Sequence, residues 1–282
     1  STAATGQGLS PADIDKLPET APTLVESYGK AAQQFGELRM PAGKGPFPVA
    51  VVIHGGCWTK GFSTVRNTSP IASALAAKGV ATWNIEYRQV GDAGGGWPGT
   101  FLDWGAAVDH LRTLGKKHPI DLSRVAVVGH SAGAHAALWV GGRGRLPKGS
   151  EIAVADALPL QAVFAIDGPV DLAPMVGADV EICGKPVIVP LMGATPAEKP
   201  ERYVQASPQQ MLPLGTRQFL IGSAILSPPM AQAYRKLAQD KGDKVEFMGI
   251  QTGHFEVIAP GRDEWARIEK LILSTMLAPA TK

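Results

Sequence analysis

The chain has 282 residues with 27 basic and 25 acidic side chains, a formal net charge of +2, and 45% of its residues are apolar. This composition supports a globular core of ordinary size and excludes a disordered or collagen-like chain. No run of basic residues offers a nucleic-acid site, and no stretch reaches the roughly 18 uninterrupted apolar residues of a membrane span. We therefore expect a small-molecule substrate, with no nucleic-acid partner and no membrane span.

The ends of the chain and its cysteines bear on where the protein works. Ser1-Thr2-Ala3-Ala4 are small and include no initiator Met, as in a chain left after signal-peptide cleavage or after trimming. The only two cysteines, Cys57 and Cys183, form one bridge if the compartment is oxidising, and two buried free thiols are the alternative. A periplasmic or secreted location is the first expectation, and a cytoplasmic one is the alternative.

Apolar runs rich in β-formers alternate along the chain with segments of helical periodicity. In chain order this pattern predicts strands over 34–40 and 48–53, a helix over 71–78, a strand over 81–86, a helix over 100–117, a strand over 125–128, a helix over 131–140, strands over 162–166 and 217–221, a helix over 229–239, a strand over 245–250 and a helix over 262–277. The segment 171–202 is rich in Pro and Gly without clear periodicity, which predicts a cap-like excursion rather than a packed layer. We therefore expect one α/β domain over 1–282, with helices on both faces of a mostly parallel central sheet.

The segment Gly129-His130-Ser131-Ala132-Gly133 follows a short apolar strand and opens a predicted helix. In that context G-x-S-x-G forms a sharp strand-to-helix turn, whose small flanking residues let the central hydroxyl project. The helix N-terminus then faces the charge that develops on a reacting carbonyl. Ser131 is therefore the candidate nucleophile. A plain turn that caps a helix is the alternative.

A glycine-rich loop, His54-Gly55-Gly56-Cys57-Trp58, follows the strand predicted over 48–53. Backbone N–H groups of such a loop can point at a reacting carbonyl oxygen, and they need no particular side chain. We expect the N–H groups of Gly56 and Cys57, together with that of Ala132 after the nucleophile, to form an oxyanion hole. A tight turn beneath a tryptophan is the alternative.

His254 is the candidate general base, because the loop Gly253-His254-Phe255 follows the last predicted strand, where an imidazole can reach the nucleophile. The other five histidines lie in the two turn motifs, on predicted helices or at the end of one, and we expect structural roles for them. The histidines show no paired ligand spacing and the cysteines are far apart in sequence. We therefore expect neither a metal nor another cofactor.

These motifs follow one another as HGGCW, GHSAG and GHF, and with them the sequence resembles the α/β-hydrolase fold over nearly its whole length. It is most similar to bacterial esterase-like hydrolases related to kynurenine formamidases and the hormone-sensitive-lipase group, whose oxyanion loops read HGG-x-W or HGGG. The resemblance implies a serine hydrolase that acts on a small-molecule carboxylic ester.

The acid of a Ser-His-Asp triad is missing from the position where that family carries it. The family places an Asp after the strand that precedes the final helix–strand pair, but residues 222–229 here read GSAILSPP. A hydrolase that lacks the acid is expected to be slower by about four orders of magnitude. Asp167, at the end of the neighbouring predicted strand, is the expected substitute, since triads are defined by geometry rather than by position. A turn cap with Gly168 and Pro169 is the alternative role for Asp167, and Glu256 is the second candidate for the acid.

The expected reaction is ester hydrolysis through an acyl-enzyme, in which His254 deprotonates Ser131. Trp58, Trp97 and Phe255 are candidates to line an acyl or aryl pocket. An aryl-formamide amidase is the alternative within hydrolysis. The missing acid also leaves open a catalytically weak or non-catalytic binding protein that keeps the motif as scaffold.

The positions of the two cysteines in this arrangement give a bridge between them a specific role. Cys57 lies in the oxyanion loop, and Cys183 lies in the excursion that follows the strand ending next to Asp167. A bridge between the two sulfur atoms would tie the excursion to the oxyanion loop.

Overall fold

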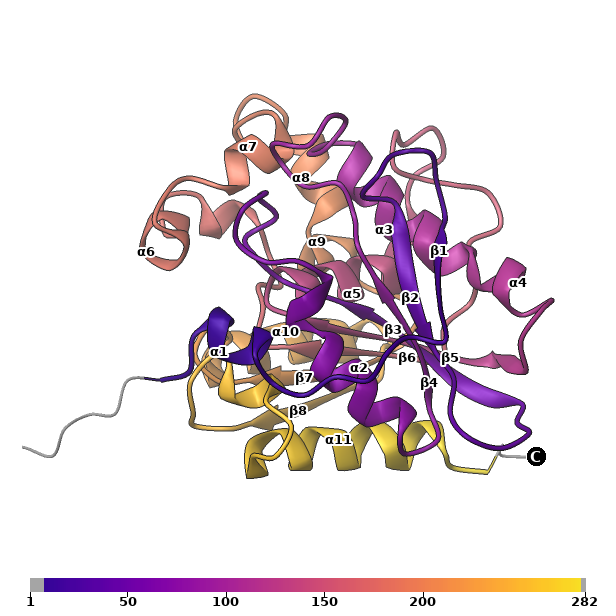
Figure 1. The fold of residues 1–282 in the computed structure, drawn as a ribbon. Helices are drawn as coiled ribbons and strands as arrows, with labels where there is room; N and C mark the ends of the chain where they lie inside the picture. The colour runs from indigo at the N-terminus through magenta and orange to yellow at the C-terminus, as the bar shows by residue number, and fades with distance from the viewer. Residues whose placement is uncertain (1–7, 280–282) are drawn as a thin grey trace, which may run out of the picture.

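The structure is a computed structural model that describes residues 8–279 (Figure 1). The expectation about Ser1-Thr2-Ala3-Ala4 lies outside the described residues. Eight strands form one sheet in the order β1-β2-β4-β3-β5-β6-β7-β8. β1 and β2 pair antiparallel, as do β2 and β4, and all other neighbours are parallel, so the predicted α/β class is confirmed. The strands are β1 (Leu24–Ser27), β2 (Phe35–Arg39), β3 (Phe47–Ile53), β4 (Ala81–Ile85), β5 (Ile120–His130), β6 (Ala162–Ile166), β7 (Arg217–Gly222) and β8 (Val245–Gly249).

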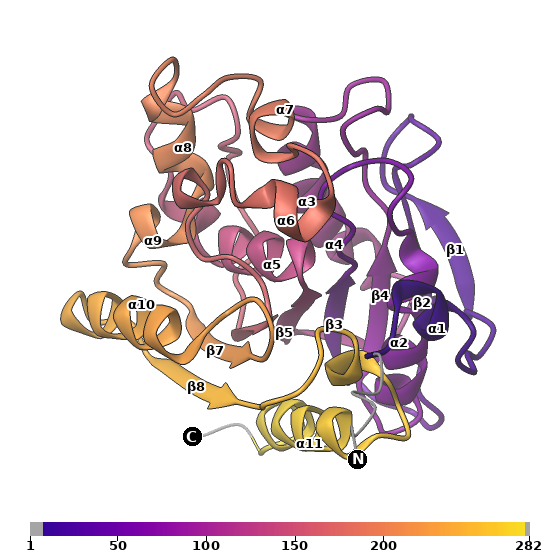
Figure 2. The same ribbon diagram turned by 90° about the vertical axis from the view of Figure 1, so that its left-hand side faces the viewer.

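Helices cover both faces of the sheet because side chains alternate along the central strands. On β3, Val49 and Val51 pack into one core cluster while Ala50 and Val52 pack into another on the opposite face. Helices α3, α5 and α10 cover the first face, and α1, α2 and α11 cover the second (Figure 2). The helices are α1 (Pro11–Asp15), α2 (Ser69–Ala76), α3 (Gly99–Asp109), α4 (Leu111–Leu114), α5 (Ala132–Gly142), α6 (Asp179–Cys183), α7 (Ile188–Met192), α8 (Pro200–Ala206), α9 (Pro208–Met211), α10 (Pro228–Asp240) and α11 (Asp263–Met276). Among residues 8–279, no helix combines the length and the apolarity needed to cross a bilayer.

The segment 171–202 differs from its prediction, since part of it is packed in the core. It contains α6, α7 and the start of α8, and Ile188 and Leu191 of α7 are fully buried against the face that carries α5. Helices of five residues are too short to show a helical period in the sequence. Gly184 and Gly193, both at positive φ, end α6 and α7 in the left-handed conformation that glycine favours.

The parallel strands bring four loops to one edge of the sheet. Ile53 pairs with Gly129, His130 with Ile166, and Ile166 with Ile221, so the carboxyl ends of β3, β5, β6 and β7 lie side by side. In open α/β sheets the loops at these ends form the ligand site.

Candidate active site

Ser131 occupies a strained turn between the end of β5 and the start of α5. Its backbone has φ +59° and ψ −121°, a combination that costs a non-glycine residue on the order of 1–3 kcal/mol. A methyl group at Gly133 would lie 2.0 Å from the carbonyl oxygen of Ile53, so only glycine fits against the end of β3. The strained turn predicted from G-x-S-x-G is therefore present.

Ser131, His254 and Asp167 come together in one row of hydrogen bonds. Nε2 of His254 lies 2.9 Å from Oγ of Ser131, and its Nδ1 lies 2.6 Å from Oδ2 of Asp167. With Nδ1–H donating to the carboxylate, Nε2 is left to accept the hydroxyl proton of Ser131. The three side chains come from the loops after β5, β8 and β6, which are separate in sequence and adjacent at the sheet edge.

The carboxylate of Asp167 is fully buried and is enclosed by backbone donors. The four N–H groups of residues 223–226 donate to it at 2.9–3.0 Å, in addition to the bond from His254. Burial by itself raises the pKa of Asp167, but the hydrogen bond and charge of His254, with the backbone donors Leu226 and Ser223, hold that pKa well below its usual range. The Asp167 carboxylate therefore stays ionised beside the imidazole.

The oxyanion loop lies directly against the nucleophile turn. A methyl group at Gly55 would lie 2.8 Å from Cβ of Ser131 and 2.9 Å from the carbonyl oxygen of His130. Across residues 8–279, none of the hydrogen bonds uses the backbone N–H of Gly56, Cys57 or Ala132 as donor. The three N–H groups predicted for the hole are thus available to a ligand.

A cavity of about 260 Å³ opens beside Ser131 and His254. Its walls are mostly apolar and come from α1, the loops after β3 and β5, α6 and the loop that carries His254. The lining residues are Pro11, Gly55, Gly56, Cys57, Phe62, Ser63, Asn67, His130, Ser131, Ile182, His254 and Phe255. The cap expected over 171–202 contains α6, but sequence reasoning did not place α1 at the site, because so short a helix carries no period of its own.

Of the three aromatic residues expected in a substrate pocket, Phe255 lines this cavity, whereas Trp58 and Trp97 do not. The indole of Trp58 is buried in the core and donates from Nε1 to Nδ1 of His135 at 3.0 Å. Trp97 packs edge to face on Phe101, with the guanidinium of Arg202 over its ring.

Glu256, the second candidate for the acid, does not contact His254. Its side chain is buried, and Oε1 accepts the backbone N–H of Leu9. Glu256 therefore holds the segment that leads into α1.

His130 and His135 are buried and uncharged, in agreement with structural roles. Burial lowers the pKa of His130 to about 3 and that of His135 to about 4. Nε2 of His130 donates to the carbonyl oxygen of His254 at 2.7 Å, and Nε2 of His135 donates to that of Ala206 at 2.7 Å. His130 thereby anchors the backbone of the loop that carries His254.

Cys57 and Cys183 are joined by a disulfide, as anticipated, with 6.3 Å between their Cα atoms. The bond ties the oxyanion loop to the last residue of α6. Because Ile182 is the neighbour of Cys183 and lines the cavity, the same link fixes one cavity wall.

The sheet order and the helices on both faces are those of the α/β-hydrolase class of proteins. Residues 37–223 match the model of the family described as BD-FAE, and the chain belongs to that family. The matched span contains Ser131 and Asp167 and ends before His254. Among curated proteins, none matches the sequence.

Solved structures with this fold include three esterases. A truncated form of a carbohydrate esterase from gut microbiota has a TM-score of 0.75 and 18% identity, over 93% of this chain and 99% of that chain. Inhibited esterase B from Lactobacillus rhamnosis has a TM-score of 0.73 and 20% identity, over 92% and 88%. Thermogutta terrifontis esterase 2 phosphonylated by sarin has a TM-score of 0.72 and 14% identity, over 94% and 99%. At these identities the likeness establishes the fold.

Proposed function

We propose that the protein is a serine hydrolase that cleaves carboxylic esters through an acyl-enzyme intermediate. The observation that carries this proposal is the continuous row of hydrogen bonds from Ser131 through His254 to the buried carboxylate of Asp167. The esterase names of the three similar structures agree with it.

In the proposed reaction, Nε2 of His254 takes the proton of Ser131 as Oγ attacks the ester carbonyl carbon. The N–H groups of Gly56, Cys57 and Ala132 hold the resulting oxyanion, and loss of one such donor costs about 10²–10³-fold in kcat. The imidazolium, stabilised by Asp167, then protonates the alcohol as the C–O bond breaks. Water repeats the cycle on the acyl-enzyme and releases the carboxylic acid.

The cavity favours an apolar group on the substrate. Phe62, Ile182 and Phe255 present apolar side chains to it, and a small volume with apolar walls suits a short acyl chain or a single ring. We therefore assign it as the acyl pocket of the proposed esterase.

The decisive experiment compares turnover of p-nitrophenyl butyrate by the native chain and by Ser131→Ala. We expect native turnover well above that of the variant, and covalent labelling of Ser131 by a fluorophosphonate in the native chain alone. Equal rates for the native chain and Ser131→Ala, together with no labelling of Ser131, would contradict the proposed hydrolase and favour a non-catalytic binding protein. Faster turnover of an N-formyl aniline than of an aryl ester would instead assign an amidase.

We further propose that 1–282 acts as one domain in which residues 171–202 cap the site, and that it works in the periplasm or outside the cell. The first part is supported by Ile182 in the cavity wall, and the second by the Cys57–Cys183 bridge, since disulfides persist in oxidising compartments. Thiol titration of protein taken from each cell fraction tests the location. Recovery of the protein from the cytoplasmic fraction alone would contradict this location, and two reactive thiols in the native protein would remove the bridge that supports it.

A further inference from the structure

Asn67 is buried in one wall of the cavity, yet the proposed reaction gives it no part. It is the last residue of the short 3₁₀ helix Val65–Asn67, and its exposed fraction is 1%. Its Nδ2 donates to the carbonyl oxygen of Pro11 at 3.1 Å and to Oδ1 of Asp15 at 2.9 Å, both on α1. Because a carbonyl oxygen and a carboxylate both require a donor, the amide nitrogen of Asn67 faces α1.

The side-chain oxygen of Asn67 is left without a partner in the protein. Within residues 8–279, no group donates a hydrogen bond to this Oδ1. A buried acceptor that stays unpaired is less stable than the same acceptor in water, so a donor on a ligand would be bound favourably. With both N–H groups of the amide directed at α1, Oδ1 is the polar atom that this side chain can offer to the cavity.

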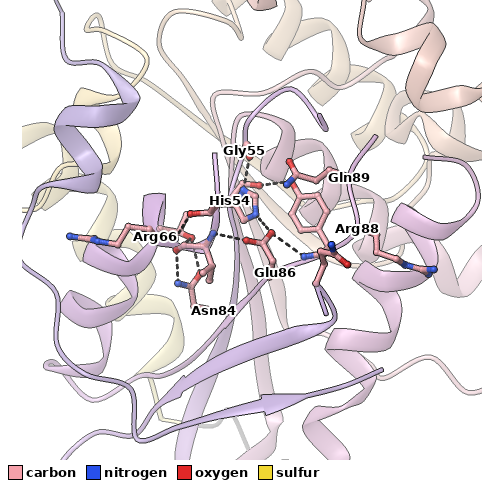
Figure 3. Close-up of polar contacts among 12 residues, drawn as sticks. His54, Gly55, Arg66, Asn84, Glu86, Arg88 and Gln89 are labelled. Carbon is pink, nitrogen blue, oxygen red and sulfur yellow. Dashed lines mark hydrogen bonds and ion pairs between the residues drawn. The ribbon is translucent and has the colours of Figure 1, made fainter. Parts of the chain in front are cut away.

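Contacts from the end of β4 hold the 3₁₀ helix that carries this amide. Oε2 of Glu86 accepts the backbone N–H of Val65 at 2.9 Å, and Nδ2 of Asn84 donates to the Val65 carbonyl oxygen at 3.0 Å. Figure 3 shows the side chains of Asn84 and Glu86 beside the segment that carries Arg66. Oε1 of Glu86 is itself held 2.5 Å from Nε2 of the buried His54. The fold therefore fixes the place of the acceptor before any ligand binds.

We propose that Asn67 determines specificity by accepting a hydrogen bond from a hydroxyl group on the acyl chain of the substrate. Of the other polar side chains in the cavity wall, Ser131 and His254 take part in the proposed reaction. The hydroxyl of Ser63 can turn either to donate or to accept, and the unpaired Nδ1 of His130 is enclosed by protein atoms. An amide oxygen can only accept, so it favours an acyl chain with a donor over one without. With apolar walls around the carbon chain, the preferred substrate class is a hydroxyalkanoyl ester.

This inference rests on the proposed esterase function and concerns which esters it prefers. The test compares ethyl 3-hydroxybutyrate with ethyl butyrate, and ethyl 6-hydroxyhexanoate with ethyl hexanoate, so that the hydroxyl is offered near the ester and at the chain end. In at least one pair, we expect the native chain to favour the hydroxylated ester by about tenfold in kcat/KM. No preference in either pair would overturn the proposal.

Asn67→Leu keeps the approximate volume of the side chain and removes the acceptor, so we expect the preference to disappear. The substitution also releases α1, and Arg66→Met is the matched control for that loss. Arg66 lies outside the cavity wall, and its Nη2 donates to the carbonyl oxygen of Leu17, just beyond the end of α1. We expect Arg66→Met to keep the native preference. A preference that survives in Asn67→Leu, or an equal loss in both variants, would overturn the proposal.

Binding to Ser131→Ala provides a readout that needs neither turnover nor a folded Asn67 variant. NMR titration of Ser131→Ala with the same four esters should give a Kd for the hydroxylated ester that is about tenfold lower in at least one pair. Equal Kd values within both pairs would overturn the proposal. A native chain no faster than Ser131→Ala would contradict only the proposed esterase function, and the binding comparison would then decide the role of Asn67 by itself.

Discussion

The carboxylate of Asp167 accepts the backbone N–H of Ser223 at 2.9 Å, although 56 positions separate the two residues. Ser223 belongs to the loop after β7. In the hydrolases that this sequence resembles, that loop carries the Asp of the catalytic triad. Because Ile166 pairs with Ile221, residue 167 and this loop lie at adjacent strand ends. The carboxylate thus enters from the neighbouring strand, and the loop without an acid contributes N–H donors to it.

Replacing Asp167 by Asn should abolish most of the proposed activity. The amide keeps the shape of the side chain but removes the charge that stabilises the imidazolium and selects its tautomer, so we expect kcat to fall by about 10³–10⁴-fold. Hydrolysis of p-nitrophenyl butyrate measures the loss, with Ser131→Ala as the blank. Glu256→Gln and the exposed Asp240→Asn serve as controls that should keep native kcat. A larger loss in Glu256→Gln than in Asp167→Asn would transfer the role to Glu256.

The stability difference between the native chain and Asp167→Asn should depend on pH. The folded-state pKa of Asp167 lies below its ordinary value of 3.8, so the carboxylate contributes its full stability above that value and loses it as the pH falls toward the folded pKa. Urea unfolding should show a constant difference of about 3 kcal/mol between pH 7 and pH 5, which shrinks below pH 4. A difference that grows toward acid would contradict this sign.

Reduction of the Cys57–Cys183 bridge should destabilise the fold. A disulfide that closes a loop of this length, with a separation of 126 residues, contributes about 2–4 kcal/mol by restricting the unfolded chain. Urea unfolding with and without a phosphine reductant measures the change. The double variant Cys57→Ala/Cys183→Ala should be insensitive to reductant. If the reductant destabilised the native chain and the double variant equally, the loss of stability would not come from this bridge.

Truncation of Ile182 should widen the acyl preference. Its side chain lines the cavity but remains 46% exposed, so Ile182→Ala removes a wall at little cost in stability. The ratio of kcat/KM for a p-nitrophenyl octanoate to that for the acetate should rise by up to about tenfold. Val180→Ala is the matched control, because Val180 lies on the same helix, is 43% exposed and does not line the cavity. An unchanged ratio in Ile182→Ala would show that the Ile182 side chain does not limit the length of the acyl chain.

The sheet was predictable because its strands are short apolar runs bounded by turn residues. The runs at 48–53 and 162–166 coincide with β3 and β6 within one residue. Glycines at fixed offsets around Ser131 located the strained turn, since a close approach of backbones leaves a pattern of small residues in the sequence. The disulfide was anticipated as one of two alternatives because the chain has only two cysteines.

What sequence reasoning missed depends on contacts between distant segments. Trp58 was assigned to a pocket from its aromatic character, but its direction is set by His135 on α5. The wall supplied by Pro11 comes from a helix of five residues, which is too short for a periodic pattern. The bond between His54 and Glu86 joins the ends of two strands whose pairing no local motif encodes.

The parallel pairing of β6 and β7 has a consequence for how relatives of this protein are recognised. The ends of β6 and β7 are adjacent, and the loop after β7 donates to the Asp167 carboxylate that contacts His254. We therefore expect that a carboxylate can move from one loop to the other while the reacting atoms stay in place. A search pattern that demands Asp after β7 would classify such chains as inactive remnants. A pattern that accepts the acid at either strand end, and asks for glycine or small residues with free N–H groups at the other, would recover them.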